Sequence, residues 1–267
     1  LPNGSLTSVA HACLLRTGKV LFFQEADREE TIIWNPSDET NPDFTYPDNQ
    51  PKNQEQENNA WLWCSGHSFL SDGTLLVCGG GGNAAVNALD SAWKFNPIAG
   101  VNGSWTRTRT NMLYKRWYPT VLTLDDGIHV MVVGGLPASY TRRSIEIYDA
   151  NIDNNPPPPN NPYVQSFTEV TTSETPRDFP QTFPGLHLLP DGSIFYSRTG
   201  WHGYPDISYT NAFFTFTGPY SGKWTEIPEK MEITDRREGM SVILLSPTYP
   251  WVRVVIVGGT GTIEPEG

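Results

Sequence analysis

One pattern recurs four times along the chain: a short apolar run, a tight turn ending in glycine, and a second apolar run. The turn glycines are Gly18, Gly73, Gly127 and Gly192, at intervals of about 54 to 65 residues. An Asp-Gly or Thr-Gly turn between runs rich in β-branched and aromatic residues is typical of a β-hairpin. A fifth unit, residues 239–259, keeps both runs and a closing glycine pair but replaces the turn by Ser-Pro-Thr-Tyr-Pro. The sequence therefore predicts a series of similar hairpins.

Several hairpins are followed by further short strand patterns. Candidate third strands span 31–36, 92–97, 144–150 and 212–218, and Trp-Thr strands follow at Trp105 and Trp224. Four short antiparallel strands in each unit of roughly 50 residues indicate an all-β, kelch-type β-propeller. No segment has convincing helical periodicity. A two-sheet sandwich is the alternative architecture, but the regular spacing of the units disfavours it.

We expect one β-propeller domain over residues 1–267, incomplete at its C-terminus, with about five blade units. The fifth unit has no outer strands of its own, and an open sheet edge leaves backbone groups unpaired. We therefore expect either that the first residues pair with the last blade or that a separate C-terminal segment completes the propeller. The polar segment 37–60 and the Pro/Asn-rich segment 151–162 are predicted to be loops on the rim.

Charge and hydropathy narrow the classes of partner. A net charge of -11 with only 18 Lys and Arg residues disfavours nucleic acid, whose phosphates need clustered cations. No apolar run is long enough to cross a bilayer, and no signal-like segment or initiator Met opens the chain. Asn3 and Asn102 each begin an N-glycosylation triplet. We expect a trimmed, secreted protein that acts on uncharged or weakly charged molecules.

Three cysteines are too few for a disulfide framework in a chain of this length. Cys13 and Cys78 have apolar neighbours and are predicted to be buried thiols. Cys64 stands nine residues before the turn glycine of its hairpin, and Tyr118 stands nine residues before the next one. Equivalent positions of successive inner strands lie side by side around a propeller channel. Cys64 and Tyr118 are therefore predicted neighbours at the mouth of the channel.

A thiol beside a phenol can be oxidised with copper and oxygen to a thioether at the carbon ortho to the hydroxyl. The sulfur then delocalises an unpaired electron, so a stable tyrosyl radical becomes accessible. A phenolate oxygen also binds Cu(II) well, and radical plus copper supply two one-electron acceptors. That pair suits oxidation of a primary alcohol or hydrated aldehyde, with both electrons passed to O2 as H2O2. The alternative is that Cys64 and Tyr118 only fill space in the core. Counting nine residues back from the turn glycine in the other units gives Val9 and Phe183, which are ordinary packing residues.

Four segments resemble successive blades of the galactose oxidase and glyoxal oxidase family of copper radical oxidases, most closely its glyoxal-oxidase-like branch. They are HACLLRTGKVLFF, WCSGHSFLSDGTLLVCGG, KRWYPTVLTLDDGIHVMVVGG and FPGLHLLPDGSIFYS, and the likeness extends from about residue 11 to 259. It implies a seven-bladed propeller when complete. It also implies that Cys64 is the cross-linked cysteine and that Tyr118 is the radical tyrosine and a copper ligand. The implied cofactors are copper and the Cys–Tyr thioether, and the implied substrates are small aldehydes, alcohols or carbohydrates.

The chain also departs from the family. The family's axial tyrosine and first copper histidine are adjacent in a later blade, and this chain contains no Tyr-His pair. The histidines are His11, His67, His129, His187 and His202, and their offsets from the turns differ, so no metal cluster is expected. His67 and His187 are expected to bond partners beside the inner strands. This chain alone is therefore not expected to be an active oxidase.

Galactose oxidase stacks a tryptophan over its thioether, and the corresponding position in this chain is Pro137. Trp201 is the candidate replacement, as a shield of the radical or a contact for substrate.

Two other functions remain open. A non-catalytic propeller would bind carbohydrate or a protein through aromatic rim loops around Trp201, Tyr204 and Tyr209.

The third hypothesis is a hydrolase with a carboxylate pair in the channel. Asp72, Asp126 and Asp191 are its only obvious candidates, and each lies in a predicted hairpin turn. Aspartate side chains in such turns commonly accept hydrogen bonds from the turn's own backbone. We therefore expect these carboxylates to hold the hairpins and not to act as catalysts.

Overall fold

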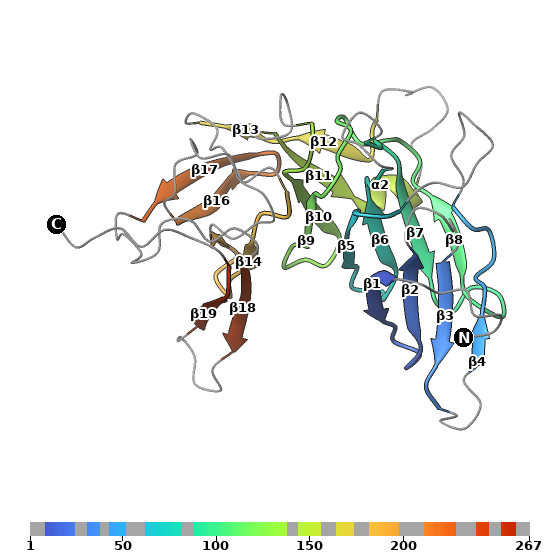
Figure 1. Cartoon of the computed structure of the whole chain (residues 1–267). Helices are drawn as coiled ribbons and strands as arrows, with labels where there is room; N and C mark the ends of the chain where they lie inside the picture. Colours follow the sequence, from blue (N-terminus) through green and yellow to red (C-terminus); the bar gives the residue numbers. More distant parts are fainter. Residues whose placement is uncertain are drawn as a thin grey trace.

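The computed structural model describes residues 9–24, 31–37, 43–51, 62–81, 88–137, 144–155, 164–173, 182–197, 211–227, 239–245 and 252–259. In these ranges the regular structure is almost entirely β, arranged as four multi-stranded sheets and a final hairpin that follow one another along the chain (Figure 1). Among the described residues, no helix has the length and apolarity to traverse a lipid bilayer.

Each of the first three sheets has four antiparallel strands in chain order. The first contains β1 (Val9–Leu14), β2 (Val20–Gln24), β3 (Thr31–Asn35) and β4 (Asp43–Thr45). The second contains β5 (Gly66–Phe69), β6 (Leu75–Cys78), β7 (Ala92–Asn96) and β8 (Ser104–Arg107). The third contains β9 (Thr120–Thr123), β10 (His129–Val133), β11 (Ile145–Asp149) and β12 (Phe167–Glu169).

The fourth sheet repeats this arrangement with one addition. Its antiparallel strands are β14 (Leu186–Leu188), β15 (Ile194–Tyr196), β16 (Ala212–Gly218) and β17 (Ser221–Glu226). The short strand β13 (Thr171–Thr172), which follows β12 in the chain, pairs in parallel with β17 at the outer edge. The last hairpin consists of β18 (Met240–Leu245) and β19 (Val252–Val257). The predicted repeat of four-stranded units is confirmed for the first four units.

The predicted turn chemistry is present in the hairpins. In the second sheet Gly73 has φ 80°, and the Asp72 carboxylate accepts a hydrogen bond of 2.8 Å from the Thr74 amide. The Asp126 and Asp191 carboxylates bond the amides of their own turns in the same way. These three aspartates therefore hold the hairpins, as expected, since an Asx bond fixes the turn locally.

Two segments predicted to be loops contain regular structure. Within 37–60, strand β4 pairs with β3 and forms the edge of the first sheet. A strand of three residues at a sheet edge is too short to show an alternating apolar pattern. Residues 151–154 belong to a short helix, α2 (Ala150–Asn154). The Asp149 carboxylate accepts hydrogen bonds from Asn151 N and Ile152 N, which caps the first turn of this helix.

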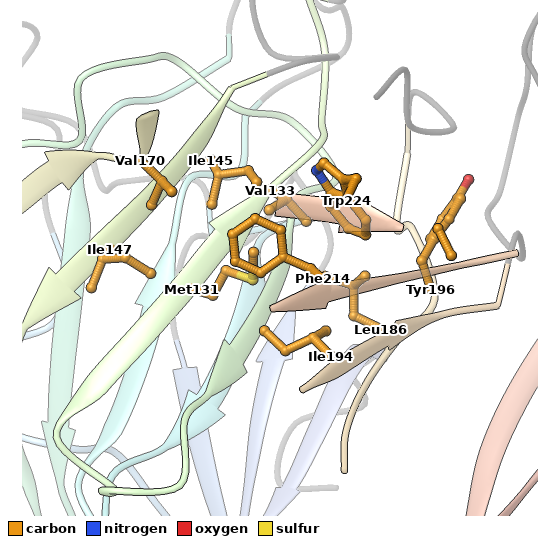
Figure 2. Packing of buried hydrophobic residues seen from close by; sticks show 11 residues of the cluster. Met131, Val133, Ile145, Ile147, Val170, Leu186, Ile194, Tyr196, Phe214 and Trp224 are labelled. Atoms are coloured by element: carbon orange, nitrogen blue, oxygen red, sulfur yellow. The ribbon is translucent and has the colours of Figure 1, made fainter. Parts of the chain in front are cut away.

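Neighbouring sheets pack face against face, with one apolar cluster at each of three junctions. Figure 2 shows the junction of the third and fourth sheets, where Met131 and Ile145 face Ile194 and Phe214. Inner strands bury both faces in this way, and all four residues of β6 are buried. This explains why their sequences are continuous apolar runs and do not alternate with polar residues.

The last hairpin presents an exposed apolar face. Met240 pairs with Val257, and Val242 pairs with Val255, so these four side chains share one face of the two-stranded sheet. Met240 is 76% exposed and Val242 is 50% exposed. At the other junctions a face of this kind packs against the next sheet. The opposite face contacts the fourth sheet, where Ser241 lies 2.8 Å from both His187 and Ser197.

Candidate functional site

Cys64, Tyr118 and Phe183 share an unusual backbone conformation. Their φ angles are 57°, 65° and 45°, in the left-handed region that non-glycine residues rarely adopt. Each such residue costs about 1–2 kcal/mol of conformational free energy. All three residues stand nine positions before a turn glycine. Their shared conformation confirms the predicted equivalence of these positions. Val9 differs: it lies in β1, whose pairing shifts between Val9 and His11.

Backbone hydrogen bonds join these equivalent positions directly. The Tyr118 amide donates to the Cys64 carbonyl at 2.8 Å, and the Phe183 amide donates to the Tyr118 carbonyl at 2.8 Å. Cys64 leads into β5 and Tyr118 leads into β9, the innermost strands of the second and third sheets. The prediction that Cys64 and Tyr118 are neighbours in space is therefore confirmed.

The two side chains also meet in a buried environment. Cys64 is 7% exposed and Tyr118 is 6% exposed. Burial raises the pKa of the Tyr118 phenol, and a hydrogen bond with the Cys64 side chain raises it further. The phenol is therefore protonated at neutral pH. The thiol of Cys64 and the phenol of Tyr118 therefore interact directly.

Aromatic rings surround the phenol. Trp117 lies against Tyr118 with ring centroids 4.5 Å apart and an interplanar angle of 33°. Phe183 meets Tyr118 edge-on at 5.2 Å, and Trp63 lies 6.2 Å from Trp117. Trp117 was not a predicted site residue. The available signal was a tryptophan immediately before both Cys64 and Tyr118.

The structure therefore provides a tryptophan that packs against the phenol at a tilt, from the adjacent sequence position. Trp117 is fixed by paired backbone bonds with Leu136: its amide donates to the Leu136 carbonyl at 2.9 Å, and the reverse bond is 2.7 Å. Pro137 directly follows this bridge. Trp201, Tyr204 and Tyr209, which were predicted to be aromatic rim residues, lie outside the described residues.

Cys13 and Cys78 are buried and form no disulfide in the part of the chain that is described, as predicted. Burial raises the pKa of Cys13 to about 12 and also raises that of Cys78. Both thiols are therefore protonated and poorly nucleophilic. Cys64 differs from them in its backbone hydrogen bond with Tyr118 and its left-handed φ angle.

Two histidines lie near this site, and another contacts the last hairpin. The rings of His11 and His67 meet edge-on with centroids 5.2 Å apart, and His11 also meets Phe183 at 6.5 Å. His187 Nε2 lies 2.8 Å from Ser241 Oγ, which confirms the expected polar partner for His187. Among the described residues, no three His, Cys, Asp or Glu side chains converge on a possible metal site. Cys64 and Tyr118 alone do not form a complete copper site.

The partly buried pair of His11 and His67 predicts a loss of stability in acid. Burial and the neighbouring His67 lower the pKa of His11 from 6.5 to about 4. Between these values the unfolded chain binds a proton that the folded chain does not, so stability falls as pH decreases. The loss reaches about 3 kcal/mol near pH 4. Urea unfolding of wild type and His11→Phe from pH 7 to 4 should show a shallower decline in the variant. Parallel curves would contradict this assignment.

Comparison with known proteins agrees with the architecture and extends it. Residues 44–199, more than half of the chain, match the family model described as glyoxal oxidase N-terminus. A solved fungal alcohol oxidase of the AA5 family, in complex with copper, has a TM-score of 0.60. It is 17% identical and is matched over 94% of this chain and 54% of its own length. Together with the repeated sheets, this likeness confirms an all-β propeller fold.

The chain belongs to the glyoxal oxidase N-terminus family, within the wider group of glyoxal and galactose oxidases. A curated relative, Aldehyde oxidase GLOX of Vitis pseudoreticulata, is 32% identical over 136 residues. That alignment covers 50% of this chain and 22% of the relative. The chain therefore spans about half of the solved relative and less than a quarter of the curated one. The matched family segment contains both Cys64 and Tyr118.

Proposed function

We propose that this chain carries the cysteine–tyrosine cofactor of a secreted copper radical oxidase, with Cys64 and Tyr118 as its catalytic pair. The full-length protein would oxidise a small aldehyde or primary alcohol with O2 and release H2O2. The supporting observation is the contact between a buried thiol and a buried phenol at equivalent positions of adjacent blades.

The proposed cross-link forms a bond between Cys64 Sγ and a ring carbon of Tyr118 ortho to its hydroxyl. The S–H and one ring C–H bond break, and O2 takes up the two electrons and two protons as H2O2. Electron donation from sulfur makes the phenol easier to oxidise by one electron. Trp117 covers the ring at 4.5 Å and would keep water away from the oxidised phenol.

Copper would supply the second one-electron centre when bound. Tyr118 is the copper ligand that we propose within this chain. The other ligands are proposed to come from a C-terminal segment that completes the propeller. Such a segment would also cover the exposed apolar face of β18 and β19, where Met240, Val242 and Val257 are at least half exposed.

Intact-mass measurement and peptide mapping test the cofactor in the full-length protein after copper loading in air. A thioether joins the peptides that contain Cys64 and Tyr118, lacks two hydrogens, and survives reducing agents. Cys64→Ser should not form the joined peptide, and Cys13→Ser should form it as the wild type does. Recovery of Cys64 and Tyr118 unmodified from the wild-type protein would overturn the proposal.

A further inference from the structure

A fully buried ion pair lies two residues before the candidate radical tyrosine. Arg116 and Glu146 are both 0% exposed. Arg116 Nε donates to Glu146 Oε1 at 2.8 Å, and Arg116 Nη2 lies 2.8 Å from the same oxygen. A buried charge pair is unfavourable unless its remaining donors and acceptors are also bonded. The remaining hydrogen bonds of Arg116 and Glu146 therefore show which segments this pair holds in place.

The other N–H groups of the Arg116 guanidinium donate hydrogen bonds to the third sheet. Arg116 Nη1 donates to the Gly134 carbonyl at 2.7 Å, and Nη2 donates to Ser144 Oγ at 2.8 Å. The second carboxylate oxygen of Glu146 accepts a 2.6 Å hydrogen bond from the Leu113 amide. The planar guanidinium of Arg116 thus connects the segment before Tyr118 to the end of β10 and the start of β11. A lysine could not reproduce this set of bonds.

The backbone of Arg116 is bonded to the second sheet's connections. Its amide donates to the Leu89 carbonyl at 2.9 Å, and its carbonyl accepts a 2.9 Å hydrogen bond from the Gly80 amide. The preceding residue, Gly79, is close enough that an added Cβ would lie 2.2 Å from the Arg116 carbonyl oxygen. The glycine pair that closes β6 therefore leaves the space that Arg116 occupies between the two sheets.

We infer that Arg116, held by Glu146, is a positioning residue that keeps Tyr118 against Cys64. This inference rests on the proposed function. Tyr118 has a strained left-handed backbone, and such strain persists only where the surrounding structure opposes its relaxation. Arg116 provides that opposition from both adjacent sheets. Bond formation between sulfur and carbon requires the two atoms to remain close and aligned, so a small relaxation of this segment slows it strongly.

Two variants separate positioning from stability. Arg116→Met leaves the Glu146 carboxylate buried without its cation, whereas Arg116→Met with Glu146→Met removes both charges. We expect thioether formation in the copper-loaded full-length protein to slow at least about tenfold in both, because neither variant restores the bonds to Gly134 and Ser144. If the double variant regains stability and also the wild-type rate, the role of the pair is only structural and the inference is wrong.

Lys94→Met is the matched control. Lys94 Nζ lies 2.5 Å from a carboxylate oxygen of Asp153, whose side chain is 1% exposed, so this pair also joins the second and third sheets. Asp153 also accepts a hydrogen bond from the Arg109 amide, but among the described contacts neither Lys94 nor Asp153 bonds Arg116 or Tyr118. Cross-linking in Lys94→Met should proceed at the wild-type rate. Arg116→Lys provides a second test if Arg116→Met does not fold, and it should also cross-link slowly.

Hydrogen exchange of the copper-free protein separates failure of this inference from failure of the proposed function. The Tyr118 amide, which bonds the Cys64 carbonyl, should exchange faster in Arg116→Met and in the double variant, but not in Lys94→Met. If wild type never forms the thioether, the proposed function is wrong, and this exchange result alone decides the positioning role. Unchanged exchange at Tyr118, or a wild-type cross-linking rate in both Arg116 variants, would overturn the inference.

Discussion

Replacing Tyr118 with phenylalanine is expected to abolish both the thioether and the oxidase activity of the full-length protein. The phenol oxygen is the group that loses an electron in the proposed cofactor and the proposed ligand for copper, and phenylalanine has no counterpart to it. Phenylalanine keeps the ring that packs between Trp117 and Phe183. The free energy of unfolding should therefore change by only about 1 kcal/mol, the typical contribution of one hydrogen bond.

Peroxide release and peptide mapping measure the effect, and thermal unfolding followed by circular dichroism reports the fold. Tyr148→Phe is the matched control, because Tyr148 is also a buried tyrosine but lies in β11. It should retain the cross-link and peroxide release. Oxidase activity in Tyr118→Phe that equals the wild type would show that Tyr118 is not the radical residue.

Replacing Arg116 with methionine is expected to lower the free energy of unfolding by about 3–5 kcal/mol at neutral pH, because Glu146 is then buried without a cation. Burial already raises the pKa of Glu146, and the Arg116 guanidinium opposes that rise. Without Arg116 the pKa rises further, and the carboxyl takes up a proton more readily. The destabilisation should therefore be smaller at low pH than at pH 7, which urea unfolding at several pH values measures.

The double variant Arg116→Met with Glu146→Met provides the internal comparison. It buries no charge, so it should recover most of the stability lost in Arg116→Met. A double variant that is as unstable as Arg116→Met would show that packing, and not the uncompensated carboxylate, accounts for the loss. A loss below about 1 kcal/mol in Arg116→Met would contradict the burial of an intact ion pair.

Much of the fold follows from local patterns. The Asp72 carboxylate bonds the amide two residues further on, and Gly73 permits the turn. This hairpin can therefore be predicted from the local sequence without any tertiary contact. Equal spacing from successive turns also predicted that Cys64 and Tyr118 are neighbours. Counting works here because each blade repeats the same geometry and adjacent blades pack in register.

Local patterns failed where long-range contacts select the structure. Strand β4 is only three residues long, Asp-Phe-Thr, and it forms because the edge of β3 is available for pairing. The contact of Trp117 with the Tyr118 ring was missed because it depends on paired backbone bonds between Trp117 and Leu136. No sequence period distinguishes such a residue from ordinary core packing.

The sequence by itself determined the repeating hairpins, the all-β class and the pairing of one cysteine with one tyrosine, because turn chemistry and repeat spacing act over a few residues or recur in each blade. Only the tertiary structure decided that the Tyr118 amide bonds the Cys64 carbonyl and that Arg116 meets Glu146. These contacts join residues about 30 to 54 positions apart. Their formation depends on burial between packed sheets, where a charge or a backbone amide must find its partner.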